Sequence, residues 1–165
     1  DMLDVGVPEE VSVTTNGTVL HDRAEDYLRD LRMHPIVSVD GTAPGTVEAI
    51  RVGVDGARLW QHIDRVQQIS EETGAGMTLS FCLMVESWPE VGGFLEEVDR
   101  RGEGVYPNVV RVQAPEVHSL RSLDQVELRT ILGHLRDERG RADPRSSDVL
   151  RVWQEVLDWV EVLSR

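Results

Sequence analysis

The chain has 165 residues, which suits one domain, and a domain of that size buries roughly 70% of the surface exposed by its unfolded chain. Its 30 acidic and 17 basic residues give a formal net charge of −13, which excludes nucleic acid as the main partner because a phosphate-backbone binder needs a positive face. Strand-sized apolar runs predict no membrane partner, and the single cysteine, Cys82, excludes an internal disulfide framework and predicts a cytoplasmic protein.

Two strand-like runs, each closed by a glycine, open the chain. Residues 11–16 form the first run, and helical spacing of apolar residues follows over 22–32 until Pro35 interrupts it. Residues 36–40 form the second run. After a loop and a short turn of helix, apolar residues at helical spacing predict a longer helix over 57–73.

The same alternation continues in the second half of the chain. Residues 77–84 form the strongest strand-like run, a helix pattern follows over 88–101, and the fourth run is 109–113. Two helices over 124–138 and 146–164 complete the pattern. Strands that alternate with helices indicate βαβ units, so we predict one α/β domain with a parallel sheet or barrel.

Each strand-like run has one apolar face and one small or polar face, because successive side chains in a strand point to opposite faces. The polar faces comprise Ser12, Thr14 and Asn16, then Ser38 and Asp40, then Thr78, Ser80 and Cys82, and finally Arg111 and Gln113. A dry barrel interior is packed with branched aliphatic residues, so these faces predict a barrel or half-barrel with a wet or ligand-filled lumen. A sheet covered by helices on one side only gives the same alternation.

The candidate functional residues follow the strand-like runs, since ligands of parallel α/β folds bind at the carboxyl ends of the strands. Asn16-Gly17 and Asp40-Gly41 let the chain turn sharply while they present polar side chains. Taken alone, such dipeptides are ordinary turn signals.

In this order, however, the motifs resemble the middle of the radical S-adenosylmethionine (SAM) superfamily. The resemblance rests on Thr15-Asn16-Gly17-Thr18, Val37-Ser38-Val39-Asp40-Gly41, Ile50-Arg51-Val52-Gly53, and Ser80-Phe81-Cys82-Leu83-Met84 with the following Trp88. It covers residues 5–123. It implies a partial, TIM-like barrel in which the four parallel strands here are the third to sixth of a (β/α)6 half-barrel.

What the resemblance implies is a fragment of an enzyme that binds a [4Fe–4S] cluster and SAM. Such an enzyme generates a 5′-deoxyadenosyl radical and abstracts hydrogen from a small-molecule or peptide substrate, with an electron donor as a further partner. In the family, a CxxxCxxC loop holds the cluster and a Gly-Gly-Glu-Pro-like stretch contacts the methionine amine. Neither motif is present here. We therefore expect the metal ligands in a preceding N-terminal part, and no catalysis by this chain alone.

Carried over position by position, the resemblance assigns cofactor contacts to six residues. Ser38 is expected near the ribose and Asp40 at the turn, and the planar fork of Arg51 matches the cofactor carboxylate. The remaining expected contacts are those of Thr15 and Asn16 with the adenosine and of Val110 with the adenine. As alternatives, Arg51 is a surface arginine on a short helix and Val110 a core valine.

Side-chain alternation alone adds candidates for substrate contact, namely Ser80, Cys82, Arg111 and Gln113. A buried inert thiol explains Cys82 equally well. Two other interpretations of the whole chain stay open. One is a non-catalytic α/β binding or scaffold module that lacks the cluster, and the other is an unrelated α/β domain whose turn motifs match by chance.

Overall fold

The computed structural model of the protein describes residues 11–165, in which strands and helices alternate as predicted. The main elements are β1 (Ser12–Thr15), α1 (Asp22–Asp30), β2 (His34–Val39), α2 (Pro44–Ile50), α3 (Gly56–Thr73), β3 (Met77–Leu83), α4 (Val91–Arg101), β4 (Val105–Arg111), α5 (Gln125–Arg141) and α6 (Ser147–Leu163). Short 3-10 turns cover Trp88–Glu90, Glu116–His118 and Leu120–Ser122.

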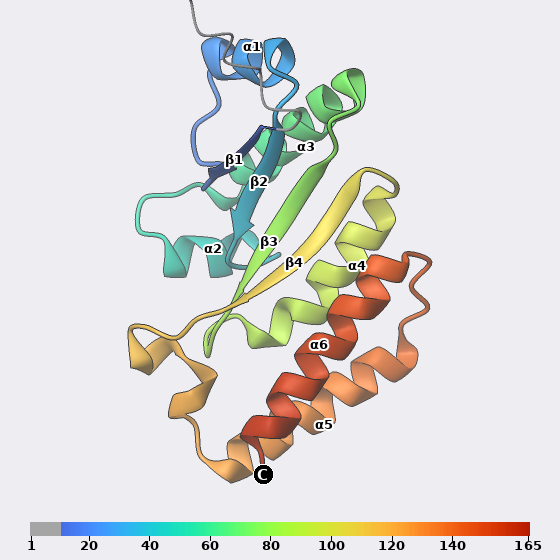
Figure 1. Ribbon diagram of the computed structural model, residues 1–165. Helices are drawn as coiled ribbons and strands as arrows, with labels where there is room; N and C mark the ends of the chain where they lie inside the picture. Colours follow the sequence, from blue (N-terminus) through green and yellow to red (C-terminus); the bar gives the residue numbers. More distant parts are fainter. Residues whose placement is uncertain (1–10) are drawn as a thin grey trace, which may run out of the picture.

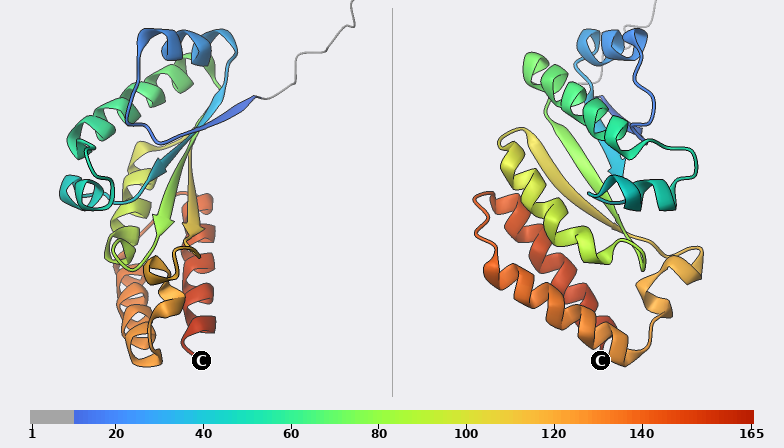
Figure 2. Two further views of the ribbon diagram at one scale, coloured as in Figure 1. Left: turned by 90° about the vertical axis from the view of Figure 1, so that its left-hand side faces the viewer. Right: turned by 180° about the vertical axis from the view of Figure 1, so that it is seen from behind.

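The four strands form one parallel sheet in the order β1-β2-β3-β4 (Figure 1). α2, α3 and α4 lie on the same side of this sheet, and α6 packs beside β4 and against α5 (Figure 2). The helices of residues 11–165 leave the opposite face of the sheet open, where Tyr106 and Val110 are 45% and 46% exposed. The α/β class and the parallel sheet are thus confirmed. An open sheet and a segment of a barrel share this arrangement.

Two strands begin earlier than the sequence predicts, and each contains a proline. β2 starts at His34 instead of residue 36, and β4 starts at Val105 instead of residue 109. Pro107 lies inside β4, in register with Leu79. Because β4 is an edge strand, the backbone donor that proline lacks is not needed by a second neighbouring strand.

The hydrophobic core lies between the sheet and its helices. The side chains of Leu79 and Phe81 in β3 are fully buried there, and the ring of Phe81 lies 5.0 Å from that of Phe94 in α4. Trp153 of α6 is only 1% exposed and extends this core past β4. The apolar faces of the strands therefore lie under the helices, as the alternation predicted.

Local side chains set the ends of the helices. α5 begins at a capping box, in which the Asp124 carboxylate accepts from the backbone N–H of Glu127 (2.9 Å) and the Glu127 carboxylate accepts from that of Asp124 (2.9 Å). α3 ends at Gly74, whose φ of 70° is the left-handed conformation that glycine adopts without strain. The turn at Gly74 ends the helix and leads the chain into β3.

Candidate functional site

The guanidinium of Arg51, directly after α2, connects the carboxyl ends of β1 and β2. Its Nη1 donates to the carbonyl oxygen of Asn16 (2.8 Å), and its Nη2 donates to that of Ser38 (3.2 Å). Its Nε donates to the carboxylate of Asp40. We call Asn16, Ser38, Asp40 and Arg51 the Arg51 cluster. It brings together four of the six residues predicted to contact a cofactor.

The ion pair in the Arg51 cluster is largely shielded from solvent. Asp40 is 5% exposed, and the side chain of Arg51 is 17% exposed. A carboxylate at this depth needs a bonded cation, because burial of an unpaired charge costs several kcal/mol. The pair therefore holds the turn after β2 at a fixed position beside the end of β1.

Cys82 in β3 joins the Arg51 cluster through Asp40. Burial, the hydrogen bond with the Asp40 carboxylate and the charge of that carboxylate together raise the pKa of the Cys82 thiol to about 12. The thiol is therefore protonated at neutral pH, whereas nucleophilic attack and metal ligation both require the thiolate. This favours the inert thiol among the two interpretations of Cys82.

We expect Cys82 to react with iodoacetamide at pH 8 more slowly in the folded protein than in the urea-unfolded chain, by one to two orders of magnitude. A pKa of about 12 instead of 9.0 lowers the thiolate fraction about 1,000-fold, and the greater nucleophilicity of a more basic thiolate offsets part of that loss. Mass spectrometry of quenched samples gives both rates. Equal rates in the two states would show that the thiol is accessible and ionisable.

A second carboxylate, that of Glu90, holds the loop between β2 and α2. Its Oε2 accepts from the backbone N–H groups of Thr42 (2.5 Å) and Ala43 (2.9 Å) and from the Thr42 hydroxyl (3.0 Å). Its Oε1 accepts from the hydroxyl of Thr46. Ala43, at the start of α2, has no side chain that can cap the helix, and Glu90 accepts from its backbone N–H, one of the N–H groups that a helix start leaves without a partner.

The Glu90 carboxylate is ionised at neutral pH. Burial raises its pKa, but the hydrogen bonds from Thr46, Ala43 and Thr42 outweigh burial and lower the pKa below its usual value. Gly41 is required beside it, because a Cβ there would lie 2.8 Å from Thr46 and 3.0 Å from Glu90. Glu90 thereby fixes α2 and, through α2, the position of Arg51. Sequence reasoning missed this residue.

A groove of about 390 Å³ opens at the same edge of the sheet. It is lined by Gly45, Thr46, Ala49, Ile50, Met84, Glu86 and His118. The Nδ1 of His118 lies 2.5 Å from Oε1 of Glu86, and the backbone N–H of Val85 donates to the His118 carbonyl oxygen (3.0 Å). The loops after β3 and β4 are thus tied together around a carboxylate–imidazole pair. Sequence reasoning missed this pair, because no spacing relates His118 to Glu86 among the five histidines of the chain.

Three of the predicted contact residues lie on the open face of the sheet. Ser80 accepts a hydrogen bond from the side-chain amide of Asn108 (2.9 Å). Cys82 is in register with Val110, so these two side chains lie next to each other on this face. Val110 is half exposed, and therefore it is not a core valine.

Arg111 lies on the opposite face from the predicted one. It is in register with Leu83, on the helix-covered side, and its guanidinium lies 5.4 Å from the ring centre of Trp159 in α6 and donates to the Glu155 carbonyl oxygen (3.3 Å). Alternation shows which residues of one run share a face, but only the register between strands shows which face that is. The placement of Arg111 beside Ser80 was therefore wrong. Gln113 lies beyond the end of β4 and is exposed.

Thr15 is also separated from the Arg51 cluster. Its side chain lines an apolar cavity on the helix-covered side, and its hydroxyl accepts from the backbone N–H of Gly17 (3.1 Å). The amide side chain of Asn16 accepts from the backbone N–H and the hydroxyl of Thr18 (3.2 and 2.9 Å). In this turn Asn16 thus contributes its backbone carbonyl, and not its side chain, to the cluster.

Comparison with models of known protein families gives no match, and comparison with curated protein sequences gives no significant match. Among residues 11–165, no helix has the length and apolar character needed to span a membrane. The function is therefore inferred from the geometry of the carboxyl edge of the sheet.

Proposed function

We propose that this chain forms part of a SAM-binding barrel of the radical SAM type, and that the carboxyl edge of β1 and β2 forms part of the cofactor site. The observation that carries this proposal is the Arg51 cluster. It gathers Ser38, Asp40 and Arg51 at the edge where parallel α/β folds bind ligands. The parallel strands lie side by side in chain order, with helices on one side of the sheet and polar side chains on the other. This arrangement supports the proposal that the sheet is a segment of a barrel wall.

The residues of the Arg51 cluster fit the amino-acid and ribose groups of SAM. A guanidinium carries five N–H groups, and Arg51 uses one on each nitrogen for oxygens of its own chain. Among the contacts of residues 11–165, one N–H group on each terminal nitrogen has no partner, and two such groups match a two-bond contact with a carboxylate. The hydroxyl of Ser38 is half-buried on the open face, where it suits a ribose hydroxyl.

The [4Fe–4S] cluster, in contrast, does not fit the residues of this chain. Cys82 is the single cysteine, and its thiol is protonated in the fold. The reductive chemistry of a cluster-bound SAM therefore requires cysteines from another segment or polypeptide. We assign to this chain the positioning of the cofactor and of a small-molecule or peptide substrate. Within residues 11–165, β1 pairs with β2 alone, so its other edge is available there for the remaining strands.

SAM binding by the isolated chain tests this proposal. In a titration followed by amide NMR, we expect a Kd on the order of 1 mM, because only part of the site is present. Shifts should be confined to the turns after β1 and β2 and to Arg51. Ser38→Ala should weaken binding several-fold, whereas Thr130→Ala, on the exposed side of α5, should leave it unchanged.

The alternative function is a non-catalytic binding or scaffold module, and one observation favours it. Three N–H groups of Arg51 are bonded within the chain, so the Arg51 cluster is stable without a ligand. If saturating SAM causes no shifts at the carboxyl edge, or if Ser38→Ala binds SAM as well as the natural chain does, the cofactor proposal fails. The scaffold module is then the better description.

A further inference from the structure

A second cavity, of about 250 Å³, lies on the helix-covered side of the sheet between α1, β1 and α3. Its walls are mainly apolar, with Thr15, Tyr27 and His62 as the polar side chains among them. They include Val13 and Val37 from the strands, Leu28 from α1, and Ile63 and Val66 from α3. The Arg51 cluster and the open face of the sheet are not part of these walls.

The polar side chains at this cavity already have partners within the chain. The Nδ1 of His62 lies 2.8 Å from the carbonyl oxygen of Gly17, and since a carbonyl only accepts, Nδ1 carries the proton. The hydroxyl of Thr15 accepts from the N–H of the same glycine. The Tyr27 hydroxyl accepts from Nε of Arg23 (2.8 Å). A ligand in this cavity therefore meets mainly apolar surface.

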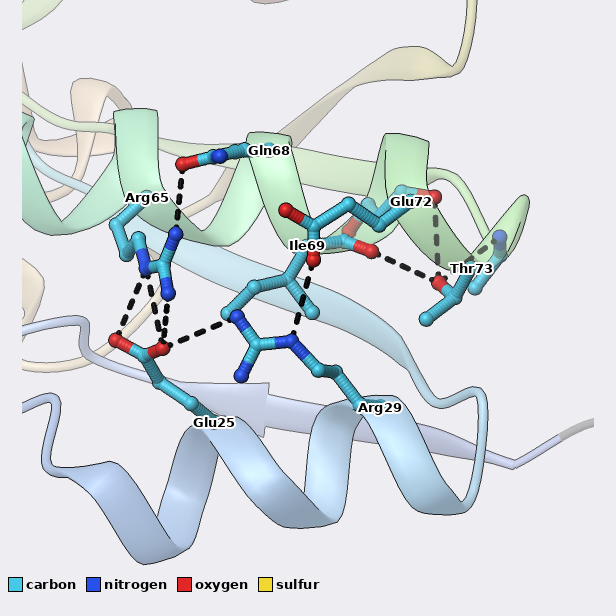
Figure 3. Close-up of polar contacts among 9 residues, drawn as sticks. Glu25, Arg29, Arg65, Gln68, Ile69, Glu72 and Thr73 are labelled. Atoms are coloured by element: carbon cyan, nitrogen blue, oxygen red, sulfur yellow. Dashed lines mark hydrogen bonds and ion pairs between the residues drawn. The ribbon is translucent and has the colours of Figure 1, made fainter.

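Charged side chains connect α1 to α3 (Figure 3). Leu28 is the only residue of α1 that is buried. Glu25 pairs with Arg65 of α3 (2.6 Å) and Arg29 with Glu72 (3.2 Å). The hydrogen bond from Arg65 lowers the pKa of Glu25, so this carboxylate is ionised at neutral pH. These ion pairs hold α1 beside α3, next to a space that the side chains of residues 11–165 do not fill.

We propose that this cavity is a binding site for an uncharged apolar molecule the size of a single aromatic ring. An apolar cavity of about 150 Å³ is large enough to bind benzene. This cavity is larger, at about 250 Å³, and it opens to solvent beside Val19 and Tyr27, which are 70% and 46% exposed, so a molecule that enters it removes apolar wall from water. A charged ligand would lose its hydration without gaining a partner. The proposal is independent of the cofactor site.

Benzene titration of the full chain, followed by NMR of the methyl groups, tests the site directly. We expect saturable shifts for Val13, Val37 and Ile63. The methyl groups of Leu132 and Val156, which are buried on α5 and α6, should not shift. Shifts that spread equally over both sets, or that fail to saturate, would show general partitioning into the core and overturn the proposal.

Filling the cavity provides a second test. Ala24 is a half-buried wall residue on α1, so Ala24→Leu should occupy the cavity and weaken benzene binding about tenfold or more. Ala57→Leu makes the same change at an exposed position of α3 and should leave the Kd unchanged. Unaltered affinity in a folded Ala24→Leu protein would overturn the assignment. If that variant does not fold, the methyl shifts of the natural chain decide alone.

Discussion

Replacement of Arg51 by methionine is expected to lower the free energy of unfolding by about 3–5 kcal/mol, because it leaves the Asp40 carboxylate buried without its cation. Methionine keeps most of the side-chain length and removes the charge and all five N–H groups. Asp40 is only 5% exposed, so water cannot replace the lost partner. Urea unfolding at pH 7 measures this loss as a shift of the midpoint at constant m-value.

The controls for this prediction separate charge from geometry. Arg51→Lys keeps the charge but loses the fork that reaches Asn16 and Ser38, so its cost should be intermediate. The double variant Asp40→Asn with Arg51→Met should be more stable than Arg51→Met alone, because no unpaired charge is left. A loss below about 1 kcal/mol for Arg51→Met would contradict the prediction, because it would mean that water solvates the Asp40 carboxylate in the fold.

The alternation of strands and helices was predictable from sequence because the periods of 2 and 3.6 residues are local properties. The starts of β2 and β4 were not. Pro35 and Pro107 look like boundaries in the sequence, but the cost of a proline depends on whether a neighbouring strand needs its backbone donor. That information lies in the order of the strands.

The meeting of Asn16 and Asp40 at one edge was predictable, because the carboxyl ends of parallel strands lie together and these residues directly follow two adjacent strands. Arg51 was named only from the family resemblance. The contacts of Glu90 and His118 were not predictable. Glu90 is 48 residues from Thr42, and His118 is 32 residues from Glu86. Such pairs depend on how two loops fold over the edge of the sheet, for which the sequence carries no periodic signal.

Replacement of Glu90 by alanine is expected to lower the free energy of unfolding by about 3 kcal/mol. The change leaves the N–H groups of Thr42 and Ala43 and the hydroxyl of Thr46 without their charged acceptor, and each hydrogen bond to a charged group contributes roughly 1.5–3 kcal/mol before relaxation and hydration offset part of the loss. Urea unfolding at pH 7 measures this loss of unfolding free energy. Glu96→Ala, at an exposed position of α4, is the matched control and should change stability by less than about 0.5 kcal/mol.

The effect of Glu90 should also depend on pH. Because its pKa in the fold is lower than in the unfolded chain, the carboxylate stabilises the fold fully above its usual pKa of 4.5. This contribution is lost as the pH falls through the lowered pKa, so the difference between the natural chain and Glu90→Gln should shrink on acidification. A difference that stays constant down to pH 2 would show that the charge of Glu90 is not what holds the loop.

The Glu90 contacts and the Arg51 cluster should also be coupled energetically. Glu90 fixes the start of α2, and Arg51 follows the end of that helix, so loss of the Glu90 carboxylate loosens the position of the guanidinium. The combined variant Glu90→Ala with Arg51→Met should therefore cost less than the sum of its parts. Strict additivity would mean that α2 does not transmit the position of Glu90 to Arg51, and that the two carboxylates hold separate parts of the edge.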